Sequence, residues 1–264
     1  MKSGFPVTFA VVLSLGLSWL GFVVAPAVQL GGVTQTTVLN TSDVYPPQRT
    51  GDATLGLQVY RANGCAACHT EQVRQDGVTC EVVLTAAGAN PQAVTNLLAT
   101  LTLKGLTKEA ADVVADQITA AGGKSETHIV PNGADLDHGW GVRQSVAEDY
   151  LHDYPVQLGS LRAGPDLANI GVRNPDASLQ LKHLYAPRSI NGTSGMPAFK
   201  YLFTVQKIGD TPSPDALNLQ GVDAPPTGYE VVPKLEARQL VAYLLSLRAN
   251  VPVYDAPFTP PAKP

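Results

Sequence analysis

The first stretch of the chain is apolar and uncharged. Residues 3–42 carry no charged side chain, and residues 5–30 within them read FPVTFAVVLSLGLSWLGFVVAPAVQL. A helix needs about 20 apolar residues to cross a bilayer. We therefore predict a transmembrane helix here, with residues 1–31 as a membrane anchor. Lys2 is the only charge before the run and Asp43 the first after it, which favours an N-terminus inside the cell.

A cleaved signal peptide is the alternative interpretation of this segment. Ala25-Pro26-Ala27 has the small residues of a cleavage site, but the apolar run exceeds the about 7–15 residues usual for such a peptide. The length favours a retained anchor in the cytoplasmic membrane. Both interpretations place the rest of the chain across that membrane, in the periplasm.

Three later segments have the apolar spacing of short helices. Residues 55–64 form an amphipathic pattern that ends at Gly64, and a second helix is expected near residues 176–185. Residues 232–247 give the clearest pattern, with Pro233 in the first turn and an apolar face of Leu240, Tyr243, Leu244 and Leu247. These segments predict a mainly α fold.

Residues 79–130 have a different periodicity. Residues 80–85 and 126–130 are typical of strands, whereas residues 91–103 and 107–121 are typical of helices. The order predicts a small inserted β-α-α-β module. Two roles remain open for it: a docking module for a partner subunit, or a lid that packs on the rest of the fold.

Composition narrows the class of protein. Of 264 residues, 44% are hydrophobic and 15% charged, which indicates a globular chain. The 24 glycines, 21 prolines and 6% aromatic residues favour short helices joined by long ordered loops. A net charge of −4 gives no basic surface for nucleic acid, so we exclude that class of partner.

The strongest chemical signal is Cys65-Ala66-Ala67-Cys68-His69, the C-x-x-C-H pattern of covalent haem attachment. Two cysteines three positions apart on a tight turn lie on one face, where both sulfurs can bond one porphyrin. His69 then follows as the proximal iron ligand. We predict one covalent haem c.

Two other interpretations of the cysteines are weaker. A structural zinc site normally takes four ligands, yet Cys80 is the only further cysteine. A thioredoxin-like redox pair would have a strand–helix context, and it does not require an adjacent histidine. We expect Cys80 to be a buried small hydrophobe, with a redox thiol as the alternative.

Met196 is the predicted sixth ligand. Apart from Met1 it is the only methionine, and it lies in a loop bounded by glycine and proline over residues 191–199. A thioether there can reach the haem face opposite His69, and His/Met ligation raises the reduction potential. The alternatives are a methionine that fills a gap in the core, or a second histidine ligand from among His128, His138, His152 and His183.

Several motifs in the same order resemble a known family, the mono-haem subunits of cbb3-type cytochrome c oxidases. The resemblance covers about half of the chain, and these subunits also have an N-terminal anchor. The matching blocks are Gly56 to His69, Asp153-Tyr154-Pro155, Gly159-Ser160, Arg162, Gly164-Pro165-Asp166-Leu167, Pro187-Arg188-Ser189 and Met196-Pro197. The G-S-x-R-x-G-P-D-L block distinguishes this family from other cytochromes c.

The resemblance implies roles for individual residues. The carbonyl of Pro165 would accept the proton of His69, and Arg162 and Arg188 would pair with the haem propionates. The alternative for each arginine is an exposed surface charge. Trp140 and Tyr60 would wall the haem edge, with a place in the core as the alternative.

The chain departs from the family pattern at three positions. Thr70, Glu71 and Leu158 stand where other members usually have serine, glutamine and tryptophan. We expect these positions to shape the contact surface near the haem, so the departures put the identity of the partner in doubt.

We expect a class I cytochrome c-like haem domain whose C-terminal helix packs on the helix before Cys65. The predicted parts are an anchor at 1–31, a linker at 32–49, a haem domain at 50–78 and 131–250, the insert at 79–130, and a Pro-rich tail at 251–264.

The predicted function is single-electron transfer within a terminal oxidase. No catalytic centre is expected in this chain, and its partners would be a haem–copper catalytic subunit and another cytochrome c. The alternatives are a haem subunit of another respiratory complex, such as a nitric oxide reductase or an alternative quinol-oxidising complex, and a haem sensor or enzyme with an open sixth position.

Overall fold

The computed structural model describes residues 4–38 and 44–252. Three predicted features lie wholly or partly outside the described residues. They are Lys2, residues 39–43 of the predicted linker, and the predicted Pro-rich tail from residue 253. About 43% of the described residues are helical, which agrees with the predicted mainly α class. The chain divides into two compact units, one of residues 1–48 and 146–156 and the other of residues 49–145 and 157–264.

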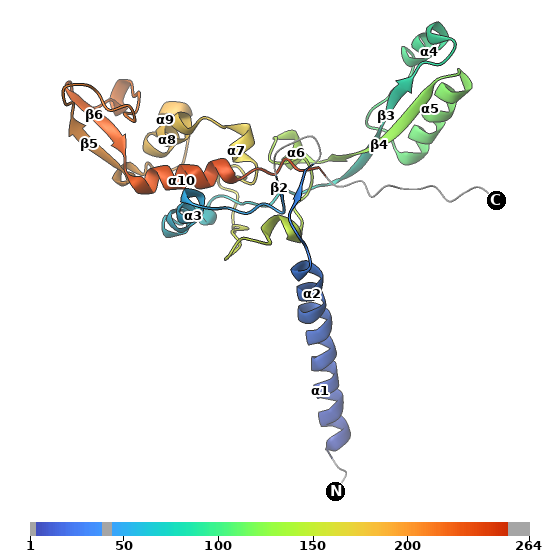
Figure 1. Ribbon diagram of the computed structural model, residues 1–264, viewed down its shortest axis with the longest axis horizontal. Coiled ribbons are helices and arrows are strands. Elements are labelled where there is room, and N and C mark those ends of the chain that lie inside the picture. The colour runs from blue at the N-terminus through green and yellow to red at the C-terminus, as the bar shows by residue number, and fades with distance from the viewer. Residues whose placement is uncertain (1–3, 39–43, 253–264) are drawn as a thin grey trace. The chain divides into compact units, whose positions relative to one another are not determined.

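The first unit begins with a long apolar helix (Figure 1). It consists of α1 (Phe5–Trp19), a π-helical turn (Leu20–Val24) and α2 (Ala25–Gly31). Together these 27 residues are long and apolar enough to cross a membrane, and no residue of the most apolar stretch is buried within the protein. The helix therefore fits the predicted membrane anchor.

The π-helical turn accommodates Pro26. Proline has no N–H to continue the α-helical ladder. Immediately before it, the N–H of Ala25 bonds to the carbonyl of Leu20, five residues earlier. This wider turn carries the helix past Pro26 without a break.

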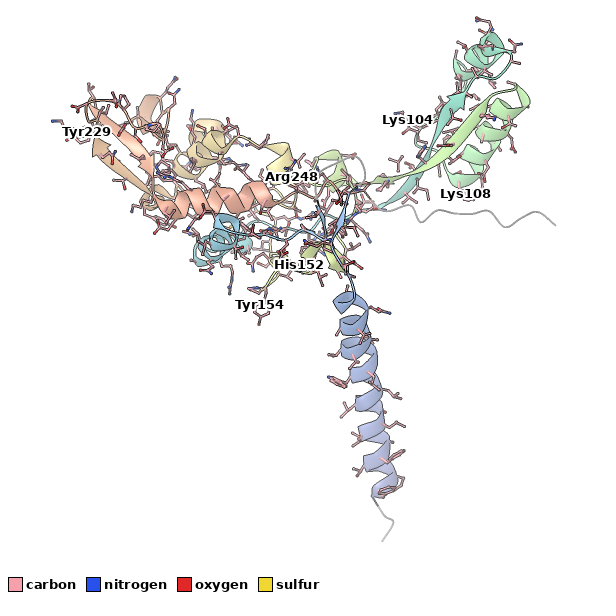
Figure 2. The ribbon with its side chains drawn as sticks, in the orientation of Figure 1. Lys104, Lys108, His152, Tyr154, Tyr229 and Arg248 are labelled. Atoms are coloured by element: carbon pink, nitrogen blue, oxygen red, sulfur yellow. The ribbon has the colours of Figure 1, made fainter. Side chains whose placement is uncertain are left out.

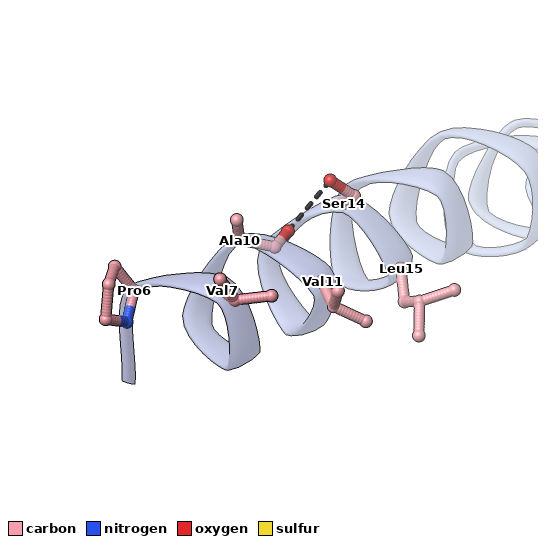
Figure 3. Close-up of a pocket in the computed structure, with 6 residues that line it drawn as sticks. All are labelled: Pro6, Val7, Ala10, Val11, Ser14 and Leu15. Atoms are coloured by element: carbon pink, nitrogen blue, oxygen red, sulfur yellow. Dashed lines mark hydrogen bonds between the residues drawn. The ribbon is translucent and has the colours of Figure 1, made fainter. Parts of the chain in front are cut away.

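A hollow on the surface of α1 is lined by one helix only. In Figure 3, the Ser14 hydroxyl donates to the Ala10 carbonyl at 2.8 Å, which satisfies the polar side chain in the hollow. The lining residues are Pro6, Val7, Ala10, Val11, Ser14 and Leu15. The hollow is a groove between side chains of an apolar helix, and it contains none of the predicted site residues.

The rest of the first unit is small. β1 (Thr36–Thr37) pairs antiparallel with β2 (Val44–Tyr45), and a 3₁₀ turn spans Ala147–Tyr150. The Tyr45 hydroxyl donates to Asp149 at 2.8 Å. This bond joins the turn to the N-terminal segment.

In the second unit, α3 (Asp52–Ala62) packs directly against α10 (Leu235–Ser246). At their contact, a Cβ on Gly56 would lie 1.9 Å from the carbonyl oxygen of Gln239, so only glycine fits. The rings of Tyr60 and Tyr243 meet at 5.2 Å between centroids. This is the contact expected between the C-terminal helix and the helix before Cys65.

The C-terminal helix starts later than its sequence pattern predicts. Val232 and Pro233 belong to β6 (Tyr229–Pro233), which pairs antiparallel with β5 (Phe203–Lys207). Val232 pairs with Thr204 and Pro233 with Phe203. Strand pairing therefore holds these two residues, and the helix begins at Leu235.

Short helices connect the remaining segments of this core. They are α7 (Ile170–Arg173), α8 (Ala177–Tyr185), α9 (Pro187–Ile190) and 3₁₀ turns at Lys200–Leu202 and Gly221–Asp223. The helix expected near residues 176–185 is α8, whose N-cap Asp176 accepts from the Ser178 N–H at 2.8 Å. The buried core includes Leu57, Leu184, Tyr185, Leu202, Val231, Leu240 and Leu244.

The segment after the cysteine motif has the elements β3 (Gly77–Ala86), α4 (Pro91–Leu98), α5 (Lys108–Ala120) and β4 (Lys124–Asn132). A four-residue helix, α6 (Ala134–Asp137), follows. β3 and β4 pair antiparallel, with Cys80 opposite Ile129. A separate core of Cys80, Val82, Ala111, Val114 and Ile118 joins α5 to the strands, so Cys80 is buried among apolar groups.

Helix α4 is shorter than predicted. The pattern extends it to residue 103, but it ends at Leu98. Backbone bonds draw the next segment onto β3: Val82 N–H donates to the Leu103 carbonyl at 2.8 Å, and Cys80 exchanges bonds of 2.8 and 3.0 Å with Leu106. Pairing with β3 therefore takes precedence over helical propensity.

Candidate haem-binding site

The cysteine motif forms a single tight turn after α3. Gly64 has φ +66°, a left-handed conformation that favours glycine and lets the chain leave the helix. Cys65–Ala67 is a 3₁₀ turn, and the N–H groups of Cys68 and His69 donate to the Cys65 carbonyl at 3.1 and 3.0 Å. Cys65 is half-buried and Cys68 is exposed.

The environment of Cys65 shifts its pKa upward. Burial raises the pKa of Cys65 to about 11, and the nearby Glu71 and Cys68 add to the shift against a backbone hydrogen bond that lowers it. Reactive redox cysteines have a lowered pKa. The raised pKa of Cys65 is opposite in direction to that shift.

The imidazole of His69 is fixed by a backbone carbonyl. Its Nδ1 lies 2.8 Å from the carbonyl oxygen of Pro165. A carbonyl can only accept, so Nδ1 carries the proton and Nε2 keeps the lone pair that binds a metal. The donor set therefore fits the proximal side of a haem iron.

Two glycines leave room for the histidine. A Cβ on Gly164 would lie 2.3 Å from Cε1 of the His69 ring, and a Cβ on Gly159 would lie 2.3 Å from the His69 carbonyl oxygen. Gly159 also has φ +78°, which favours glycine. These contacts give a physical reason for both glycines of the G-S-x-R-x-G-P-D-L block.

Backbone bonds hold that block against the cysteine turn. Ser160 donates to Ala66 at 3.1 Å, Gly164 to Cys68 at 2.9 Å, and Leu167 to Thr70 at 2.8 Å. The two segments are far apart in sequence but lie side by side over this length.

The carboxylate of Asp166 is buried next to the histidine loop. Asp166 is 0% exposed and accepts from the Thr70 hydroxyl at 2.5 Å, the Gln72 N–H at 2.9 Å and the Ala168 N–H at 2.8 Å. These three bonds satisfy a carboxylate that burial would otherwise destabilise.

Arg162 connects this carboxylate to a second one, Asp135. Its guanidinium donates to both Asp135 oxygens at 2.7 and 2.8 Å, to the Thr70 hydroxyl at 2.8 Å, and lies 3.4 Å from Asp166. Burial would raise the pKa of Asp135, but bonds from Arg162 and the Arg74 N–H outweigh it and lower this pKa below its usual value. The network joins both ends of the 77–132 segment to the histidine loop.

The predicted haem-edge residues occupy different environments. Arg162 is bound to protein carboxylates, and Trp140 stacks between its guanidinium, at 5.1 Å, and the His138 ring, at 4.8 Å. Arg188 is exposed and donates to the Ser194 carbonyl at 3.4 Å. Contacts of Arg162, Arg188, Trp140 and Tyr60 with a haem stay predictions.

Met196 is partly buried against the main core, as is Cys65. The hydroxyl of Ser194 accepts from the Met196 N–H at 3.2 Å and helps to shape the loop. Both predicted haem-binding segments therefore border one core.

The rival histidine ligands are dispersed. His183, on α8, is partly buried, and burial together with His69 lowers its pKa. His128 is exposed on β4, His138 stacks on Trp140, and His152 is exposed in the first unit.

The expectation for Thr70 and Glu71 was wrong. They were placed at a contact surface, but they are only 5% and 4% exposed, because Thr70 joins the Asp166 network and Glu71 accepts from the Tyr243 hydroxyl at 2.8 and 3.0 Å. Burial and the Glu71 carboxylate raise the pKa of both Tyr60 and Tyr243. Leu158 is 41% exposed, and its place at a contact surface stays a prediction.

A C-x-x-C-H turn with a fixed histidine, together with the long apolar N-terminal helix, fits a membrane-anchored cytochrome. Residues 138–225 match the family described as cytochrome C oxidase, mono-heme subunit/FixO. This confirms the resemblance found in the sequence and supports a mono-haem subunit of a cytochrome c oxidase. The matched range contains the Gly159–Leu167 block, Arg188 and Met196, while the cysteine motif precedes it. A comparison with curated proteins found no match.

Proposed function

We propose that this chain binds one covalent haem c and transfers single electrons as the mono-haem subunit of a cbb3-type oxidase. Cys65 and Cys68 would attach the haem, with His69 and Met196 as axial ligands. The observation that carries the proposal is the His69–Pro165 bond of 2.8 Å, formed by the block that belongs to the family match.

The haem would supply an iron that changes oxidation state by one electron. The residues of this chain hold and orient its ligand. Gly164 and Pro165 fix the plane and tautomer of the His69 imidazole, so that Nε2 stays available. A fixed ligand limits rearrangement when the iron changes charge.

The second ligand would set the potential. A Met196 thioether on iron raises the reduction potential relative to a second histidine. Of the two arginines, Arg188 is better placed to reach a propionate, because the Arg162 guanidinium is bound to Asp135 at 2.7 and 2.8 Å.

The proposed setting is the cytoplasmic membrane, with residues 5–31 as the anchor and the haem domain in the periplasm. Electrons would come from another cytochrome c and pass to a haem–copper catalytic subunit. The family match supports such partners, since it describes an oxidase subunit.

Replacement of Met196 by alanine tests the ligand assignment. We expect the purified holoprotein to change from a low-spin to a high-spin spectrum and to bind carbon monoxide. Met196→His is the matched control, because an imidazole should retain a low-spin iron at a lower potential. A wild type that binds carbon monoxide readily, or a Met196→Ala protein that stays low-spin, would contradict the assignment.

Gentle solubilisation of native membranes tests the complex. The chain, followed by its haem, should co-purify in stoichiometric amount with a multi-span haem–copper subunit identified by mass spectrometry. Co-purification with another respiratory complex would contradict the oxidase assignment and identify the chain as a haem subunit of that complex.

A further inference from the structure

The sheet of the 77–132 segment has one covered edge and one open edge. The outer edge of β3 is covered, since Cys80 and Val82 bond to Leu106 and Leu103. β4 pairs with β3 on one side only. Within residues 4–38 and 44–252, no backbone bond reaches the other side of β4.

The pairing pattern shows which groups point outward from β4. Both backbone groups of Cys80 face Leu106, so Cys80 and the opposite Ile129 do not bond to each other. The N–H and C=O of Ile129 therefore point away from β3. By alternation, the same holds for Ser125 and Thr127. Pro131, next in this row, has no N–H.

This edge has little of the usual protection against pairing. Natural edge strands carry prolines, lysines or bulges that prevent another strand from adding. Here Lys124 and Pro131 lie at the two ends of the strand, and its middle has Glu126 and His128 but no lysine or proline. The side chain of Ile129 is 63% exposed and that of Val130 is 37% exposed.

Charge on the uncovered face indicates the occupant. Glu126 and His128 lie on the same face, with Nε2 of His128 3.7 Å from Glu126. Glu81, opposite His128 on β3, is already paired with Lys104 at 2.8 Å (Lys104 is labelled in Figure 2). Lys124 and Val130 project from the same face, and Glu126 and His128 are its titratable groups in the middle of the strand.

We infer that β4 pairs antiparallel with β4 of a second copy of this chain, centred on Thr127. Outward-facing residues must meet outward-facing residues, so the centre falls on a whole residue. A centre at 125 pairs only residues 124–126 of the strand, and a centre at 129 sets Thr127 against Pro131, so centres at 126, 127 and 128 are the candidates. A centre at 126 opposes two glutamates, and a centre at 128 opposes two histidines and places Ser125 against a proline. Only the centre at 127 sets Glu126 opposite His128, twice by symmetry.

This register also uses every outward donor. Thr127 meets Thr127 of the second copy, Ser125 meets Ile129, and Pro131 falls beyond the paired residues. The contact is isologous, as a two-fold dimer requires. The two strands then join the two sheets into one and remove both open edges.

Cysteine cross-linking in membranes that hold the full-length chain tests the register. In Thr127→Cys the two introduced cysteines would lie about 5.5 Å apart at Cα, within the range of a disulfide. Mild oxidation should give a haem-staining band of twice the mass that reductant removes. Ser125→Cys is the control, because its two copies would lie four residues apart along the strands, about 13 Å.

A charge exchange tests the same contact without cysteines. Glu126→Lys should weaken the dimer about 2–30-fold, from about 0.2–1 kcal/mol for each of the two pairs lost. Adding His128→Glu should restore it, because the introduced lysine then lies opposite the introduced glutamate. Analytical ultracentrifugation in detergent measures the change.

Two results would overturn the inference. One is a Thr127→Cys protein that cross-links no more than Ser125→Cys while its haem spectrum shows a folded protein. The other is a cross-link from position 127 to a different polypeptide, identified by mass spectrometry, which would assign the edge to another subunit.

Discussion

At the scale of single residues, the space around His69 is set by small groups. Gly159 and Gly164 lie where any Cβ would overlap the histidine, and Pro165 supplies the carbonyl that fixes its proton. Asp166, next in the chain, holds the loop in place by accepting hydrogen bonds from the Thr70 hydroxyl and the Gln72 N–H. Residues 159–165 thus position the His69 side chain by the close approach of their backbone and a backbone carbonyl, more than by their own side chains.

Gly164→Ala should disturb iron ligation without unfolding the protein. The added methyl would lie 2.3 Å from Cε1 of His69, so the ring must turn or the loop must move, at a cost of about 1–3 kcal/mol. We expect a mixed-spin spectrum and a shifted reduction potential. Gly209→Ala, with open space around the site, is the control and should leave both unchanged.

Asp135→Asn should remove part of the acid sensitivity of folding. The pKa of Asp135 is lowered in the folded protein, so its ionised form stabilises the fold above the ordinary value of 3.8, and this stability is lost as the pH falls through the folded pKa. At neutral pH we expect a loss of about 1–3 kcal/mol. Denaturant midpoints measured from pH 7 to pH 3 should show the gap between wild type and variant closing in acid.

Asp112→Asn is the matched control for this titration. Asp112 pairs with Lys108 at an exposed site, with 59% of the Asp112 side chain accessible. Such pairs contribute little. A gap for Asp135→Asn that stays constant down to pH 3 would contradict the role assigned to Asp135.

Some of these residues could be predicted and others could not. The C-x-x-C-H spacing identifies Cys65, Cys68 and His69 directly, and the family block points to Pro165. Asp135 and Arg162 lie 27 positions apart, and no local pattern links them. The need for glycine at 164 is a matter of three-dimensional space, which spacing along the chain does not encode.

At the scale of elements, the α3–α10 contact organises the core beside the cysteine turn. Gly56 allows the two helices to approach until its Cα faces the Gln239 carbonyl, and Tyr60 and Tyr243 pack one turn further along. Glu71 accepts from the Tyr243 hydroxyl. The helix contact and the histidine loop are thereby joined through one tyrosine.

Gly56→Ala should destabilise the fold although alanine is the better helix former. Propensity favours alanine by about 1 kcal/mol, but a Cβ 1.9 Å from a backbone oxygen must push the helices apart. We expect a net loss of about 1–3 kcal/mol or more in thermal or chemical unfolding. Leu55→Ala, at a 44% exposed neighbour, should cost less, and an equal loss in both variants would contradict the close approach.

Elements with strong local periodicity were predictable, whereas those fixed by pairing were not. Helices α3, α8 and α5 follow the apolar spacing closely. β5 and β6 lie 21 residues apart, and Val232 joins β6 through a partner that the local sequence does not reveal. The early end of α4 has the same origin, since residues 103–106 add to β3.

At the scale of the whole molecule, one apolar helix and one cytochrome-like unit share a chain. The helix exposes large apolar side chains, including Phe9, Leu15 and Phe22 at 58%, 65% and 85%, which water does not favour. In a bilayer, the apolar side chains of this 27-residue helix would contact lipid and not water.

The mature protein should therefore retain its N-terminus. We expect the chain to stay in the membrane pellet after alkaline carbonate extraction, with an intact mass that includes residues 5–31. A mature protein that starts near Val28 and is released by carbonate would show that the helix is a signal peptide. Leu15→Arg should reduce membrane insertion, since a central arginine costs about 2.5–3.5 kcal/mol on insertion scales.

The network around Arg162 also has a consequence for the order of events during synthesis. The groups that hold the histidine loop, from Asp135 to Leu167, are made well after it, and 96 positions separate Thr70 from Asp166. At about 5–20 residues per second, the loop emerges about 5–20 s before its anchor does. During that interval the two cysteines lie on an unconstrained segment of nascent chain. The hydrogen bonds from residues 135–167 can hold this segment only after that interval has passed.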